Sequence, residues 1–118
     1  MPYIRLSITK KLTEEQQSEL VNGLGEAIAV IPGKDHTGLM VDMEDGKTMF
    51  MAGVKQENLV FADVRYYSNF THQIKKDFTI AVFDVFTRVL GTEKEKMFLT
   101  INEYNNWGGF GGFIDEYY

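Results

Sequence analysis

The nitrogen of Pro2 is the first group in this sequence that could do chemistry. If Met1 is removed, that nitrogen becomes a secondary amine, which can act as a general base and then as an acid when its pKa lies near the working pH. Burial in apolar surroundings and neighbouring cations both lower the pKa of an alkyl ammonium. We therefore predict that Pro2 is the catalytic residue. The alternative is that Pro2 follows the initiator methionine without any further role.

Lys34 and Arg65 are the cations that we predict to assist such a base. Either charge would lower the pKa of the amine, and either could bind the carboxylate of a substrate. For Lys34 the alternative is a solvated cation in the loop that follows a helix.

Aromatic side chains in the second half of the sequence could line an apolar pocket around the amine. The candidates are Tyr66, Tyr67, Phe98, Trp107 and Phe110. Two of them have a structural alternative. Tyr67 could pack on the core at the end of a strand, and Trp107 could anchor the C-terminal segment on a neighbouring subunit.

The composition excludes several other kinds of site. There is no cysteine, so neither a disulfide, nor a thiolate nucleophile, nor a cysteine-based zinc site can form. His36 and His72 lie too far apart in the sequence to predict a metal site, and we expect no metal and no cofactor. The glycine-rich residues 108–112 are not followed by the Lys-Ser/Thr pair of a phosphate-binding loop.

The charge and hydropathy patterns limit the partners and the location. The net charge is −5, and the 12 Lys and Arg residues are scattered, so we expect no nucleic-acid partner. No apolar run is long enough to span a membrane, and the sequence does not open with an export signal. We expect a cytoplasmic protein that forms one domain over residues 1–118.

Two helices and several strands must position the candidate residues. Residues 3–8 alternate between apolar and polar side chains, as in a half-buried strand. Thr13 and Gln16 form a capping box for a first helix that Pro32 and Gly33 end, and a second helix is expected from near Ser68 to Gly91. Further strands are expected at residues 39–44, 58–66 and 97–102. The second of these is expected to be buried, Asp45-Gly46 is read as a hairpin turn, and residues 103–118 as a loop with short extended pieces.

This order of elements contains two tandem β-α-β units. It predicts an α/β (α+β) fold in which a four-stranded mixed sheet carries both helices on one face. The opposite face would then lack cover. Since we expect apolar residues from several strands on it, we predict that copies of the chain associate through their sheets.

These features together resemble the tautomerase superfamily, which includes 4-oxalocrotonate tautomerase and macrophage migration inhibitory factor. Pro2 opens the first strand, residues 13–28 look like the first helix of 4-oxalocrotonate tautomerase, and Gly33-Lys34 looks like the loop of the migration inhibitory factor branch. Residues 53–61 are similar to a segment of the longer dehalogenase relatives, and residues 105–109 look like a Gly-Trp-Asn segment of the migration inhibitory factor branch. The resemblance spans nearly the whole chain.

The resemblance implies a homotrimer with active sites at the subunit interfaces. It also implies a mature N-terminal proline, Pro2, that moves a proton between carbon and oxygen of a small α-keto acid and its enol. Lys34 matches a lysine that binds the substrate carboxylate, and Tyr67 matches a position whose backbone amide contacts substrate. Phe98 and Thr100 stand where the migration inhibitory factor branch has a tyrosine and an asparagine, so the substrate preference is expected to differ.

Other departures narrow the chemistry. Tyr66 and Asn69 replace the arginine pair of the cis-chloroacrylate dehalogenase branch, Leu12 replaces the loop arginine of 4-oxalocrotonate tautomerase, and Gly38 replaces a pocket tyrosine. We thus expect a tautomerase acting on a phenylpyruvate-like α-keto acid. The alternatives are a non-catalytic trimeric binding or signalling protein, and a related hydratase or decarboxylase in which Asn102 or Glu103 would activate water.

Overall fold

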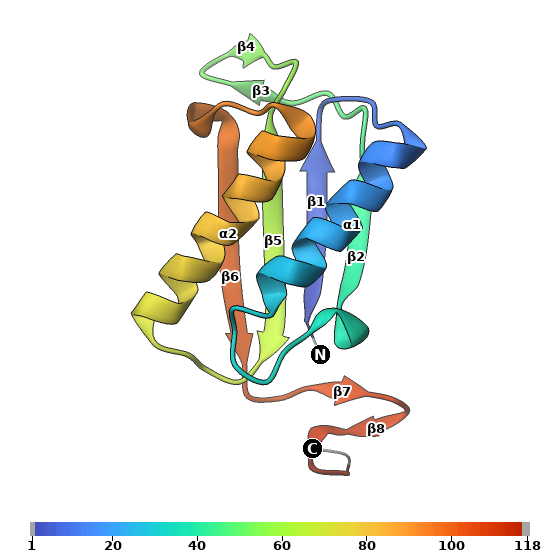
Figure 1. Cartoon of the computed structure of the whole chain (residues 1–118), viewed down its shortest axis with the longest axis vertical. Coiled ribbons are helices and arrows are strands. Elements are labelled where there is room, and N and C mark those ends of the chain that lie inside the picture. Colours follow the sequence, from blue (N-terminus) through green and yellow to red (C-terminus); the bar gives the residue numbers. More distant parts are fainter. Residues whose placement is uncertain (1, 117–118) are drawn as a thin grey trace.

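The molecule is built on a four-stranded mixed sheet with two helices on one side (Figure 1). The computed structural model describes residues 2–116. The main elements are β1 (Tyr3–Ile8), α1 (Glu14–Ile28), β2 (Met40–Glu44), β5 (Val60–Tyr67), α2 (His72–Leu90) and β6 (Met97–Tyr104). The sheet order is β2-β1-β5-β6; β1 runs parallel to β2 and antiparallel to β5, and β5 runs parallel to β6. The predicted fold class, with its two β-α-β units, is confirmed.

Local signals in the sequence define the start of α1 and both ends of α2, whereas α1 ends at Ile28, before the expected stop at Pro32 and Gly33. The hydroxyl of Thr13 accepts a hydrogen bond from the Gln16 amide, and the Gln16 side chain accepts one from the Thr13 amide, which completes the predicted capping box of α1. Helix α2 is capped by Thr71 and ends at Gly91, whose φ of +65° suits glycine. It begins later than expected because Ser68 has a φ of +92°, which a helix cannot accommodate.

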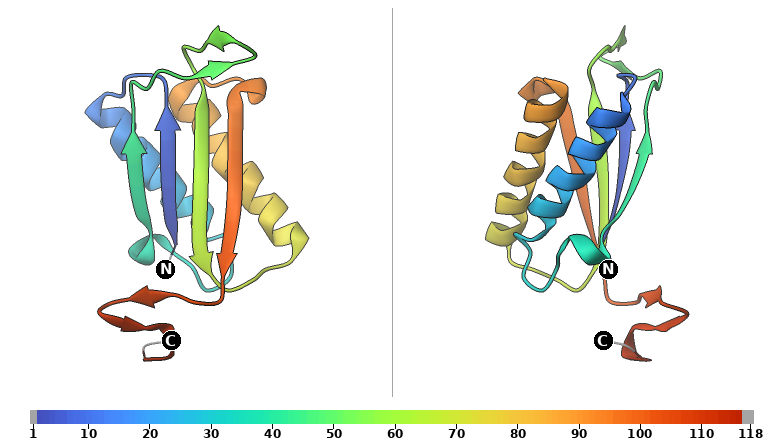
Figure 2. Two further views of the ribbon diagram at one scale, coloured as in Figure 1. Left: turned by 180° about the vertical axis from the view of Figure 1, so that it is seen from behind. Right: turned by 45° about the vertical axis from the view of Figure 1, so that its right-hand side comes forward.

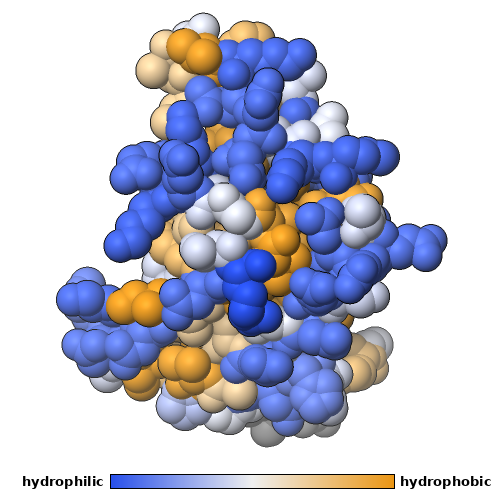
Figure 3. Space-filling view, turned by 45° about the horizontal axis from the view of Figure 1, so that its top comes forward, coloured by the Kyte–Doolittle hydropathy of each residue, from blue (hydrophilic) through white to orange (hydrophobic). Residues whose placement is uncertain are grey.

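The core lies between the helices and the sheet. Alternate side chains of β1 and β5 point toward the helices and are buried, and the apolar stripes of α1 and α2 cover them. The best-buried members include Ile4, Leu6, Ile8, Leu20, Leu24, Ile28, Val60, Val64, Phe78, Val82 and Phe86. The outer side of the helix layer is mostly hydrophilic (Figure 3). This layer therefore faces solvent.

The contact between the helices depends on Gly23. A β-carbon at this position would lie 2.7 Å from Cγ1 and 3.0 Å from Cγ2 of Val85. Gly23→Ala is expected to lower the free energy of unfolding by about 1–2 kcal/mol, because the overpacking outweighs the gain in helix propensity. Urea denaturation would measure it, with Ser18→Ala on the exposed side of α1 as the control. A more stable Gly23→Ala protein would contradict this helix contact.

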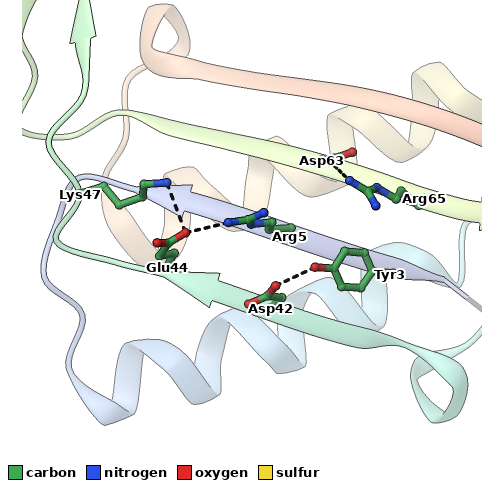
Figure 4. Close-up of polar contacts among 7 residues, drawn as sticks. All are labelled: Tyr3, Arg5, Asp42, Glu44, Lys47, Asp63 and Arg65. Atoms are coloured by element: carbon green, nitrogen blue, oxygen red, sulfur yellow. Dashed lines mark hydrogen bonds and ion pairs between the residues drawn. The ribbon is translucent and has the colours of Figure 1, made fainter.

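The uncovered face of the sheet differs from the expectation (Figures 2 and 4). Its centre carries charged side chains rather than apolar ones, held in pairs within the subunit. Tyr3 Oη donates to Asp42 Oδ2 at 2.6 Å, Arg5 pairs with Glu44 at 2.9 Å, Lys47 with Glu44 at 3.3 Å, and Arg65 with Asp63 at 2.9 Å. Exposed apolar residues of this face, Met40, Phe61, Phe98 and Tyr104, lie near the strand ends. The residues of β5 that we expected to be buried alternate instead, and those on this face are not buried.

Two small hairpins extend beyond the ends of the sheet (Figure 1). β3 (Phe50–Met51) pairs with β4 (Val54–Lys55), and the turn is Ala52-Gly53, with φ values of 53° and 77°, not Asp45-Gly46. The Asp45 carboxylate instead accepts a hydrogen bond from the Leu12 amide at 2.7 Å. At the other end, β7 (Gly108–Gly109) pairs with β8 (Gly112–Phe113), as the expected short extended pieces.

In the described part of the chain, the remaining elements are three short 3-10 helices, η1 (His36–Gly38), η2 (Lys94–Lys96) and η3 (Ile114–Glu116). Among residues 2–116, no helix is both long and apolar enough to cross a membrane.

Candidate functional site

Pro2 lies at the end of the sheet from which β1 starts (Figure 1). The residue is buried, and its carbonyl accepts a hydrogen bond from the Met40 amide at 3.0 Å. A β-carbon on Gly38 would lie 3.8 Å from Cδ of Pro2, the carbon bonded to the ring nitrogen. Gly38 is therefore the neighbour of the ring edge that carries the nitrogen, and a β-carbon there would be in ordinary van der Waals contact with it.

Lys34 lies at the same end of the sheet, in the loop that follows α1. Its amide donates to the Ile31 carbonyl at 3.1 Å, and the preceding Gly33 has a φ of +80°, so the turn directs the chain back toward the sheet. The Lys34 side chain passes inward, and only 7% of the residue is exposed. Its Nζ donates to the Tyr67 carbonyl at 3.1 Å.

Two aromatic rings complete the surroundings of the Lys34 ammonium. Nζ lies 5.2 Å from the centroid of the Tyr66 ring and 5.6 Å from that of Phe70, and the two rings meet edge to face. We call these three side chains, with the Tyr67 carbonyl, the lysine box. No carboxylate forms an ion pair with Lys34 in residues 2–116. Burial lowers the pKa of Lys34, because it penalises the charged form.

The backbone pairing relates Pro2 to this box. Tyr3 of β1 pairs with Arg65 of β5, so Pro2 and Tyr66 each lie one position further toward the same end of the sheet. Tyr67, whose carbonyl accepts from Lys34, comes next. The amine candidate and the buried ammonium are thus gathered at one end of the sheet by β1, β5 and the loop after α1.

Glu103 of β6 holds the far side of the lysine box. Its carboxylate accepts hydrogen bonds from Tyr66 Oη at 2.9 Å, the Phe70 amide at 2.8 Å and Lys75 Nζ at 2.9 Å. Burial alone raises the pKa of Glu103, but these hydrogen bonds outweigh it, and the pKa lies below its usual value. Burial, followed by the hydrogen bond to Glu103, raises the pKa of Tyr66 well above its usual value. Sequence reasoning did not find this arrangement, since no local pattern links β6 to the start of α2.

Arg65 and Trp107 lie apart from the lysine box, on the uncovered face of the sheet. They line a cavity of about 470 Å³ together with Tyr3, Met40, Tyr104, Asn106 and Gly108. The Arg65 guanidinium lies 5.6 Å from the Tyr3 ring and is already paired with Asp63. Because neighbouring residues of a strand point to opposite faces, Arg65 faces away from Tyr66.

Phe98 lies in a third place. It is 40% exposed on the uncovered face, near the start of β6, where it pairs with Phe61. Tyr104, beside Trp107, is at the other end of the same strand. Within one subunit, therefore, the six predicted site residues do not form a single cluster. Lys34 binds the Tyr67 carbonyl at the end of the sheet where Pro2 lies, Arg65 and Trp107 line the cavity on the uncovered face, and Phe98 lies near the start of β6.

Residues 2–116 contain no group of three or more histidine, aspartate or glutamate side chains that could hold a metal ion. The groups at this end of the sheet that could do chemistry are the Lys34 ammonium and, if Met1 is removed, the Pro2 amine.

Neither a protein-family model nor a curated protein sequence matches this chain. Solved structures do match it. MIF2 of Leishmania major superposes with a TM-score of 0.88 at 16% identity over 97% of each chain. Pt0534 inactivated by 2-oxo-3-pentynoate gives 0.84 at 18% identity over 93% of each chain. A fused 4-oxalocrotonate tautomerase (4-OT), solved as a symmetric trimer, gives 0.83 at 14% identity over 93% of each chain.

Further matches include other migration inhibitory factor homologues and a member of the cis-3-chloroacrylic acid dehalogenase family. The migration inhibitory factor, 4-oxalocrotonate tautomerase and dehalogenase structures all represent the tautomerase superfamily. The resemblance drawn from the sequence is confirmed as a likeness of fold over nearly the whole chain.

Proposed function

We propose that this protein is a cofactor-free keto-enol tautomerase of a small, phenylpyruvate-like α-keto acid, with Pro2 as the base and acid. The observation that carries the proposal is the lysine box. A buried ammonium is held there by a carbonyl and two rings at the end of the sheet where Pro2 lies, and the described part of the chain gives it no carboxylate partner. A substrate carboxylate would supply the missing negative charge.

The reaction needs one proton to move between two atoms of the substrate. In ketonisation, the Pro2 nitrogen accepts the proton of the enol hydroxyl, the C–O bond becomes a carbonyl, and the same nitrogen returns a proton to the neighbouring carbon. The reverse sequence gives the enol. Lys34 would bind the carboxylate and so fix the distance between these atoms and the amine, which is the main contribution of binding to such a step.

We further propose that the chain works as a homotrimer in the cytoplasm. One structure of this fold is described as a symmetric trimer. In this chain the sheet has one face without helices, and exposed apolar residues lie on both hairpins, Phe50 and Val54 at one end and Phe110 and Phe113 at the other. Within one subunit Phe98 lies near the start of β6, away from the lysine box. In the trimer, Phe98 of a neighbouring subunit would reach the site.

The second candidate is a non-catalytic trimeric binding protein, because Phe98 and Thr100 stand where the migration inhibitory factor branch has a tyrosine and an asparagine, so two polar contacts of that pocket are altered. A hydratase or decarboxylase has less support. Glu103 already accepts three hydrogen bonds, and the Asn102 amide donates to Asp63 and to the Val64 carbonyl. Neither side chain is placed to activate water.

The first test is the ultraviolet-monitored interconversion of the enol and keto forms of phenylpyruvate. The protein must be one whose intact mass shows that Met1 has been removed, and analytical ultracentrifugation of the same sample reports the assembly state. We expect a trimer that accelerates the reaction over buffer. An inactive trimer with a free Pro2 amine would instead favour the binding protein.

A chemical label offers a test that does not depend on turnover. 2-Oxo-3-pentynoate, the reagent named with Pt0534, has an alkyne conjugated to a ketone. The Pro2 nitrogen can add to the outer alkyne carbon, while a proton goes to the carbon beside the ketone. We expect mass spectrometry to find one added molecule per chain, on the N-terminal peptide. Labelling of lysine peptides alone would contradict a reactive amine at Pro2.

A further inference from the structure

We propose that Glu103 is a positioning residue for the substrate carboxylate, because it holds both aromatic walls of the lysine box in place. The inference rests on the proposed function of Lys34 and adds a residue that no part of the sequence pattern assigned to carboxylate binding. It also assigns a role to Lys75, which forms an ion pair with Glu103.

One oxygen of Glu103 makes both of the contacts that matter. Oε2 accepts from Tyr66 Oη at 2.9 Å and from the Phe70 amide at 2.8 Å. These are the two residues whose rings face the Lys34 ammonium. A single carboxylate oxygen therefore fixes the direction of one ring through its hydroxyl and the position of the other through its backbone.

The same contacts hold the turn that follows Tyr67, whose carbonyl accepts the hydrogen bond from Lys34 Nζ. The chain leaves β5 at Tyr67, passes through Ser68 with its φ of +92°, and reaches Phe70. A positive φ is unfavourable for serine and persists only where the surroundings enforce it. The Ser68 amide donates to the Tyr104 carbonyl at 2.9 Å, and Glu103 is next to Tyr104 in β6. Asn69 Nδ2 also donates to Asn105 Oδ1 at 2.9 Å, so loss of the Glu103 contacts would release only the Phe70 end of this turn. The Phe70 ring would then lose its fixed position beside the Lys34 ammonium.

Lys75 forms an ion pair with Glu103, so the Glu103 carboxylate is not the counter-ion of Lys34. Its Nζ lies 2.9 Å from Glu103 Oε1, and the side chains of the pair are 30% and 15% exposed. The carboxylate is thus neutralised on the α2 side, while its other oxygen touches only the neutral groups of Tyr66 and Phe70. The positive charge of Lys34 stays available for a ligand.

The test compares Glu103→Met with Glu95→Met, at an exposed glutamate of η2, in the phenylpyruvate assay. Methionine keeps the length of the side chain but cannot replace the carboxylate oxygen that accepts from Tyr66 Oη and the Phe70 amide, whereas glutamine would keep an acceptor there. Since Glu103 touches no reacting atom, we expect KM to rise about 10-fold in Glu103→Met with kcat within about two-fold of wild type. Tyr66→Phe keeps the ring and the Phe70 contact, so a smaller rise is expected. Glu95→Met should behave as wild type.

A double-mutant cycle separates positioning from general support of the fold. In a Lys34→Met background, Glu103→Met should leave KM unchanged, because the group that Glu103 positions is gone. Equal KM effects in both backgrounds, or a wild-type KM in Glu103→Met, would overturn the proposal.

A spectroscopic readout keeps the inference testable if the protein has no tautomerase activity. With lysines labelled at Cε, the Lys34 resonance is identified by its loss in Lys34→Met, and the two rings should displace it from those of exposed lysines. We expect Glu103→Met to move it toward the exposed position. An unmoved resonance would overturn the role of Glu103, whereas inactivity with a moved resonance would count against the proposed function alone.

Discussion

Pro2→Ala is expected to lower kcat/KM for phenylpyruvate tautomerisation by about 10²–10⁴-fold, the usual contribution of a positioned general base. Alanine leaves a primary amine at the same place in the chain, so the substitution removes the ring without removing the nitrogen. In proline the ring fixes the direction of the nitrogen, and here Pro2 is buried next to Gly38. Burial also disfavours an ammonium, which keeps a proline amine in its basic form.

The matched control is a chain with one extra residue ahead of Pro2, in which the proline nitrogen is an amide without basicity. We expect this protein to lose all activity above buffer while its circular dichroism and its assembly state match those of wild type. Equal activity in wild type, Pro2→Ala and the extended chain would exclude Pro2 as the base and would leave the non-catalytic trimer as the stronger candidate.

The sequence predicted the elements whose signals are local. The capping box of Thr13 and Gln16 and the stop at Gly91 both occur as expected, because each depends on residues within one or two turns of a helix. The alternation of residues 3–8 likewise placed β1 correctly. These elements fixed the order of the sheet, since few topologies connect two β-α-β units without crossing.

Errors arose where two local signals competed and a distant contact decided. Both Asp45-Gly46 and Ala52-Gly53 end in a glycine with a positive φ, but the Asp45 carboxylate binds the Leu12 amide, 33 residues away, and the hairpin forms at the second turn. Ser68 and Thr71 are both residues that favour a helix N-cap. The contact between the Ser68 amide and the Tyr104 carbonyl holds Ser68 outside the helix.

The candidate site was predictable in its residue types and not in its surroundings. Pro2, as a candidate amine, and Lys34, as a cation, stand out in a chain without cysteine or a metal motif. The box around Lys34 requires Tyr66, Phe70 and Glu103, which are separated by up to 37 residues and meet only because β5 and β6 are adjacent. Arg65 was an equally good cation by type, but the alternation of β5 turns it to the other face of the sheet.

Lys34→Met is expected to lower kcat/KM for phenylpyruvate by about 100-fold, mostly through a higher KM, which corresponds to about 2.7 kcal/mol of lost binding. Methionine has nearly the same length and removes only the charge and the donor. The methyl ester of phenylpyruvate sharpens the assay, since it has no carboxylate. Wild type should have a much higher kcat/KM for the acid than for the ester, whereas Lys34→Met should show no such preference. Lys94→Met, at an exposed lysine of η2, is the control and should keep the wild-type preference.

Lys34→Met should make the protein more stable although it lowers the activity. A buried ammonium without a carboxylate partner costs free energy, so Lys34→Met is expected to raise the free energy of unfolding by about 1 kcal/mol at pH 7. Burial lowers the pKa of Lys34 relative to the unfolded chain, so this cost is full below the folded pKa and fades as the pH rises through the unfolded value. The gain measured by urea denaturation should therefore shrink at alkaline pH. A cation kept to support the fold would lose stability and activity together, whereas one kept for a ligand gains stability as it loses activity.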